Sequence, residues 1–105
     1  MAITHRRTPA LMFTSKIGEF KANLDRKNTE AAMSAYMDLA SMMHKTMSAN
    51  NEKLNSAASE AEKTKLKNLI SQQEGLYRDA KMLTPDLAKN NAAIVEKLNA
   101  FVKTL

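Results

Sequence analysis

The chain has 105 residues, the size of one domain, and a domain of this size buries roughly two thirds of the surface of its unfolded chain. Helix-forming residues dominate it, and with only two glycines, two prolines and few β-branched or aromatic residues the composition argues against a sheet. The absence of cysteine excludes disulfides and thiolate chemistry, while the net charge of +5 is ordinary for solubility and selects no partner by itself.

Apolar segments of the chain are too short for a membrane span. No run approaches the roughly 20 residues that cross a bilayer, and the apolar cluster at residues 10–13 is too short for a secretory signal. We therefore expect neither a membrane span nor Sec export, and the cytoplasm is the predicted location. Residues 1–18 do contain basic but no acidic residues, a bias that mitochondrial presequences share, so this alternative stays open.

Residues 1–13 are predicted to form a basic N-terminal arm that precedes a helical domain of residues 14–105. The start of the arm shows no helical period, and the proline of Thr8-Pro9 favours an extended residue before it. From residue 14 to residue 27 a narrow apolar stripe predicts the first helix. The stripe consists of Phe13, Ile17, Phe20 and Leu24.

The second predicted helix ends near Ser48 and is apolar or small over more than half of its circumference. Asn28 either caps this helix or lies within one continuous helix, because neither Gly nor Pro enforces a break there. A helix hairpin is predicted to turn at residues 48–51, since Asn tolerates left-handed backbone conformations. The main apolar face holds Met33, Tyr36, Met37, Ala40, Met43, His44 and Met47.

A long amphipathic helix is predicted to follow this turn and to end at Leu83, since apolar residues recur on one face at helical spacing. Ser59 and Glu62 match a capping box, so the segment before them could instead be a separate short turn. The apolar face consists of Leu54, Ala58, Leu66, Leu69, Ile70, Leu76, Tyr77, Ala80 and Leu83.

A last helix is predicted to begin at Pro85, with Thr84 as its N-cap and Asp86 in its first turn. Its stripe includes Leu87, Asn91, Ile94, Leu98, Phe101 and Leu105, spaced in steps of four and three. The predicted fold class is therefore all-α, a small bundle of three or four amphipathic helices in which the last helix folds back across its predecessors.

Five of the eight methionines lie between Met33 and Met47, where flexible thioethers can fill a core or form an adaptable groove. Together with His44 they could in principle bind Cu(I), but core packing is the favoured interpretation and no metal or cofactor is predicted. His44 is expected to be a hydrogen-bonded core residue, with a pH-sensitive interface role as the alternative. Gln73 and Asn91 interrupt apolar stripes, so their amides should pair with polar groups or water.

The apolar arc of the second helix is wider than we expect one small bundle to cover, which predicts a protein partner or a homo-oligomer at this helix or at the last one. The predicted interface residues are Leu39, Met42, Met43, Met47 and Phe101. The leading function is accordingly that of a non-enzymatic interaction protein, an adaptor, an assembly or scaffolding factor or an inhibitor, that presents an apolar helical face.

Enzyme activity is not expected, because the sequence offers no paired nucleophile and base, no Gly-rich phosphate loop and no metal-binding helix motif. The alternative function is that of a basic helical accessory protein that contacts nucleic-acid phosphates through Arg6, Arg7, Lys63 and Lys67. This alternative is less favoured, since the aromatic residues fall at core spacings and form no base-stacking platform among the basic residues.

Overall fold

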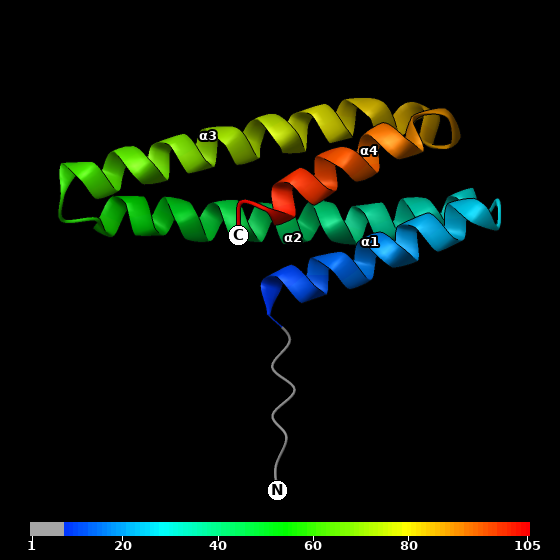
Figure 1. Cartoon of the computed structure of the whole chain (residues 1–105), viewed down its shortest axis with the longest axis horizontal. Coiled ribbons are helices and arrows are strands. Elements are labelled where there is room, and N and C mark those ends of the chain that lie inside the picture. The colour runs from blue at the N-terminus through cyan, green and yellow to red at the C-terminus, as the bar shows by residue number, and fades with distance from the viewer. Residues whose placement is uncertain (1–7) are drawn as a thin grey trace, which may run out of the picture.

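The computed structural model describes residues 8–105, and all of the regular structure in this range is helical (Figure 1). This confirms the all-α prediction and the small bundle. None of the described helices is long and apolar enough to cross a membrane. The elements are α1 Pro9–Asp25, α2 Thr29–Ser56, α3 Glu60–Leu83, the short 3₁₀ turn η1 Thr84–Asp86, and α4 Leu87–Val102.

The two longest helices, α2 and α3, form an antiparallel hairpin, and α1 and α4 pack side by side along part of it (Figure 1). α1 contacts α2 and α4, while α3 contacts α2 and α4, so the four helices enclose one core. The last helix thus folds back across the hairpin, as the sequence predicts. Short connections between the helices make sequential neighbours antiparallel.

α1 begins at Pro9, several residues before the predicted start, and the predicted boundary of the arm at residue 13 is wrong. The backbone of Thr8 is extended, and its hydroxyl accepts a hydrogen bond of 3.2 Å from the Leu11 amide. Pro9 occupies the first helical turn, where its missing N–H is not needed. Phe13 is only 2% exposed and belongs to the core rather than to an arm.

The chain breaks between α1 and α2 at residues 26–28, so Asn28 caps a separate second helix and does not lie within one continuous helix. Lys27 has a φ of 59°, in the left-handed region, and so reverses the chain direction after α1. The Asn28 side chain then accepts a hydrogen bond of 3.2 Å from the Ala31 amide and caps α2. The acidic Glu30 lies in the first turn, where it faces the positive end of the helix.

The predicted turn at residues 48–51 is wrong, because α2 continues to Ser56. Asn50 is 8% exposed and continues the buried face of α2, so its amide is held inside the protein instead of serving a turn. The chain reverses only after Ser56, and the Ser59 hydroxyl accepts a hydrogen bond of 3.2 Å from the Glu62 amide. The capping alternative is therefore the correct one for the start of α3.

The last helix also begins slightly later than predicted. Thr84 lies in the 3₁₀ turn together with Pro85, and α4 starts at Leu87. Asp86 is the N-cap, since its carboxylate accepts a hydrogen bond of 3.2 Å from the Lys89 amide. Both Thr and Asp can cap a helix, and the tight 3₁₀ turn leaves Asp86 in the capping position.

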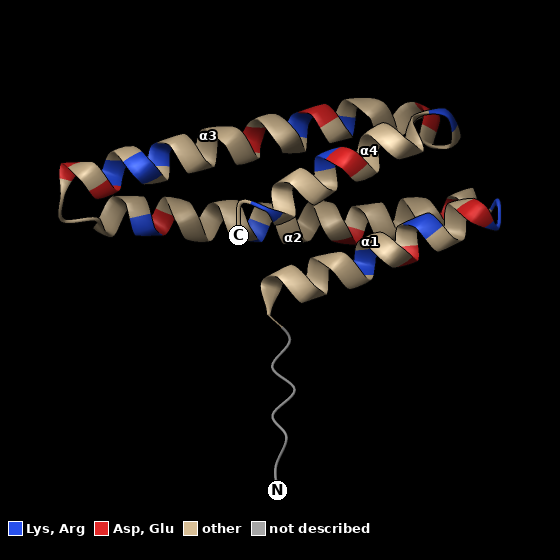
Figure 2. Cartoon of the chain, in the orientation of Figure 1, with Lys and Arg blue, Asp and Glu red and all other residues tan. Residues whose placement is uncertain are grey.

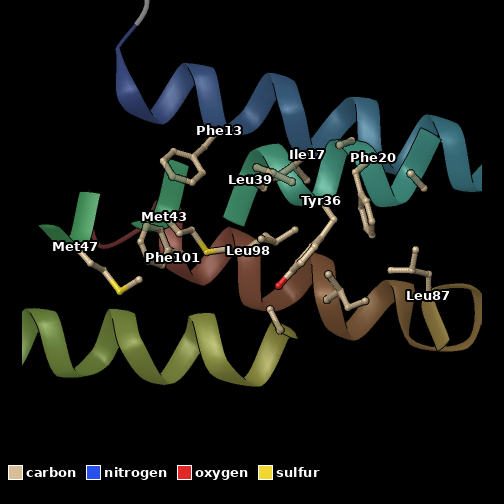
Figure 3. Close-up of a cluster of buried hydrophobic side chains, with 14 residues drawn as sticks. Phe13, Ile17, Phe20, Tyr36, Leu39, Met43, Met47, Leu87, Leu98 and Phe101 are labelled. Atoms are coloured by element: carbon tan, nitrogen blue, oxygen red, sulfur yellow. The ribbon is translucent and has the colours of Figure 1, made fainter. Parts of the chain in front are cut away.

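The core lies where α1 and α4 cover the hairpin (Figure 3). Two aromatic pairs join the helices: the ring centroids of Phe13 and Phe101 are 5.5 Å apart, and those of Phe20 and Tyr36 are 6.4 Å apart. The Tyr36 hydroxyl is buried and has no hydrogen-bond partner among the described residues. Burial raises the pKa of Tyr36 to about 12, because the ionised phenol would lose its hydration.

Candidate functional site

Four of the five predicted interface residues lie in the core of the single chain. Leu39 and Phe101 are fully buried, Met43 is 1% exposed and Met47 is 8% exposed. The premise that one chain cannot cover the wide apolar arc of α2 is therefore wrong, because α1 and α3 pack against α2 from two sides and α4 closes the core (Figure 3). Only Met42 remains partly exposed.

Met42 lies in a shallow surface groove between α1 and α2. Leu11 and Met12 of α1 line the same groove and are 54% and 46% exposed. Beside them the Lys16 ammonium lies 3.2 Å from the Asp38 carboxylate and links α1 to α2. The exposed apolar residues here are few, and singly exposed apolar side chains are common on protein surfaces.

His44 and Met37 are exposed, so the predictions that His44 is a core histidine and that Met37 lies on the buried face are wrong. Both lie in a groove between α2 and α3 with Tyr77, and the rings of His44 and Tyr77 meet edge to face at 5.8 Å. Within residues 8–105 no three His, Cys, Asp or Glu side chains are grouped as metal ligands.

Two of the four residues of the nucleic-acid alternative, Lys63 and Lys67, lie among the described residues, one turn apart on α3. Arg6 and Arg7 lie outside the described residues. The Lys63 ammonium is 3.6 Å from the Glu60 carboxylate, whereas Lys67 is exposed and in no ion pair among residues 8–105. Figure 2 shows acidic residues interspersed with the basic ones along α3. The described helices thus present alternating charges rather than a basic stripe of the kind that follows a phosphate backbone.

The least covered part of the molecule is the end of the hairpin that projects beyond α1 and α4 (Figure 1). α2 has 28 residues against 17 in α1, and α3 has 24 against 16 in α4. At about 1.5 Å per residue, the hairpin helices are therefore about 12 to 17 Å longer than the helices that pack on them. We call the projecting residues 51–72 the overhang.

A buried polar layer separates the overhang from the core. The side-chain amide of Asn50 donates a hydrogen bond of 2.9 Å to the side-chain carbonyl oxygen of Gln73. The side-chain NH₂ group of Gln73 donates one of 2.8 Å to the Thr104 hydroxyl. The prediction that Gln73 pairs with polar groups is confirmed. The Asn91 side-chain amide also pairs with a polar group, the backbone carbonyl of Ala88 at 2.7 Å, but it does so on the surface. The layer ties together α2, α3 and the residues after α4, and it can fix their register.

The overhang contains a groove of about 760 Å³ between α2 and α3. Its apolar lining consists of Ala57, Leu66 and Leu69, all only partly buried. Lys53 of α2 and Lys65 of α3 are exposed and also line the groove. These residues bring an apolar surface, two cations and several polar side chains together, a combination that suits binding rather than catalysis.

The groove lies on the side of the hairpin that α1 and α4 cover elsewhere. Lys53 is four helical turns beyond Asp38, and Asp38 pairs with Lys16 of α1. Lys65 is four turns before Asp79, and Asp79 lies 4.0 Å from Lys97 of α4. The groove thus continues the surface on which α1 and α4 pack.

No family model, curated protein or solved structure matches this chain. The site therefore rests on the chain's own residues. The apolar stripe of α3 contains Leu66 and Leu69 already in the sequence, but the misplaced turn at residues 48–51 hides the excess length of the hairpin. The signal in the sequence that locates the start of α3 is the capping box of Ser59 and Glu62, and with this start the hairpin helices are longer than α1 and α4.

Proposed function

We propose that this protein is a non-enzymatic protein-binding module, and that the groove of the overhang receives an α-helix of another protein. The observation that carries the proposal is the uncovered apolar lining: Leu66 and Leu69 are only partly buried, and no helix within residues 8–105 lies over them. Apolar surface of this kind gains about 25 cal/mol for each Å² that a partner removes from water.

The shape of the overhang supports a helix as the occupant. Two antiparallel helices leave a trough between them, and in the covered half of this protein α1 and α4 pack on the hairpin. A partner helix in the overhang would continue the same packing, in the manner of the helix-in-groove complexes that bind one apolar helix face. Such binding fits an adaptor, an assembly or scaffolding factor, or an inhibitor. We propose the cytoplasm as the location of the protein.

The proposal can be tested with single cysteines, since the natural chain contains none. Asn68→Cys places a photo-crosslinker at the edge of the groove, and Met82→Cys places one on the same helix at a residue 72% exposed but outside the overhang. In an extract of the source cells we expect one protein to crosslink from residue 68 and not from residue 82. Adding Leu69→Glu should abolish that product while circular dichroism shows an unchanged helical content.

Two results would contradict the proposal. Equal crosslinking from residues 68 and 82 would show that the protein has no preferred surface at the overhang. Crosslinking from residue 68 that persists in the Leu69→Glu background would show that the apolar lining of the groove takes no part in binding.

A further inference from the structure

Where α1 and α4 cover the hairpin, which we call the covered half, the ion pairs between these helices and the hairpin follow one rule. The hairpin supplies the acid and the overlying helix supplies the lysine. The Lys16 ammonium of α1 is 3.2 Å from the carboxylate of Asp38 on α2, and the Lys97 ammonium of α4 is 4.0 Å from the carboxylate of Asp79 on α3. One such pair lies on each side of the hairpin.

The overhang carries the opposite charge on the same side of each hairpin helix. Lys53 lies 15 residues along α2 from Asp38, and Lys65 lies 14 residues along α3 from Asp79, so each is about four turns away and rotated by roughly 40° to 60°. Neither lysine takes part in an ion pair among residues 8–105. One acidic residue, Glu62, also lines the groove, at its end nearest the turn between the helices. The two rims of the groove are thus positive where the rims of the covered half are negative.

We infer that the occupant of the groove is an amphipathic helix with acidic residues on both flanks of its apolar face. This inference rests on the proposed function. The apolar face would meet Leu66 and Leu69, and the acidic flanks would meet Lys53 on one side and Lys65 on the other. Charges that are complementary across a partly exposed interface mainly set the choice of partner and the rate of encounter.

A second copy of this chain fits the groove less well. Its own overhang would present lysines along both rims, so like charges would face one another. We therefore assign the groove to a helix of a different protein.

Three synthetic helix-forming peptides of about four turns test this inference. They share one leucine stripe and carry Glu, Gln or Lys on both flanks. Fluorescence anisotropy at low and high salt measures their binding to the wild-type protein and to the Lys53→Glu, Lys65→Glu double variant. A second double variant, Lys81→Glu with Lys89→Glu, is the matched control, because both of its lysines are exposed and lie outside the overhang.

The Glu peptide should bind the wild-type protein about tenfold more tightly than the Gln peptide, a preference that high salt should reduce. The groove double variant should prefer the Lys peptide, and the control variant should behave as the wild type. Equal binding of the Glu and Gln peptides overturns the inference of acidic flanks but leaves the groove as a helix site. If none of the peptides binds at millimolar concentration, this inference fails, and the crosslinking experiment decides the proposed function separately.

Discussion

The Tyr36 hydroxyl gives the sharpest test of the packing. It lies in the core without a hydrogen-bond partner, and the residue is 3% exposed. An unpaired buried polar group costs roughly 1 to 3 kcal/mol, and Tyr36→Phe removes the hydroxyl but keeps the ring that packs against Phe20. We expect the free energy of unfolding to rise by about 1 kcal/mol or more in urea titrations, with an unchanged dependence on urea concentration.

The same variant should also change how the free energy of unfolding depends on pH in the alkaline range. The pKa of Tyr36 is raised from 10.0 in the unfolded chain to about 12 in the folded protein, so the unfolded state loses its proton first. The stability from the neutral phenol is fully present below pH 10 and is lost as the pH rises towards 12. At about 1.4 kcal/mol per pKa unit, the loss is about 2 to 3 kcal/mol.

Comparison of the two proteins isolates this effect from that of Lys16. Hydrogen bonds to Glu19 and Asp38 raise the pKa of Lys16, so both proteins lose some stability above pH 10.5. The Phe variant should lose less between pH 10 and 12 than the wild type. A Phe variant that is less stable at neutral pH would mean that the hydroxyl has a partner, and one that shows the full alkaline loss would mean that the loss does not come from Tyr36. Either result would refute this description of the core.

Three further predictions concern the polar layer and the overhang. Gln73→Leu should lower the free energy of unfolding by about 1 to 3 kcal/mol in urea titrations, because it leaves the buried Asn50 amide without its acceptor. Leu69→Glu should change stability by less than about 1 kcal/mol, since Leu69 is only partly buried, whereas Leu39→Glu should unfold the protein, as followed by circular dichroism. Sedimentation at micromolar concentration should show a monomer, and a stable dimer that Leu69→Glu dissociates would contradict the assignment of the groove to a different protein.

The helices themselves were largely predictable from the sequence. Apolar residues at spacings of three and four define the buried faces of α1 and α4 almost completely, as at Phe20 and Leu98. The start of α1 was not predictable from the preference of Thr8-Pro9 for extended backbone alone. The same two residues are also an N-cap followed by proline in the first turn. In the structure the Thr8 backbone is extended and its side chain caps α1.

Burial and the candidate site were less predictable, because they depend on which helix covers which face. Leu39 lies in the wide arc of α2, and periodicity alone could not tell whether α1 or a second chain covers it. Asn50 carries a strong turn signal in the sequence, yet its buried hydrogen bond to Gln73, 23 residues away, keeps it in a helix. Such long-range pairing can override a local turn preference, and α2 continues past Asn50 to Ser56.

Hydrogen exchange tests the central claim most directly, since it reports on the overhang before and after a helix binds. In the free protein, amides of residues 51–72 should exchange faster than those of the covered half, because only two helices pack there. Addition of the acidic peptide should slow exchange in residues 51–72 and nowhere else to a similar extent. Equally slow exchange along the whole hairpin of the free protein, or protection that falls outside the overhang when the peptide binds, would contradict the claim.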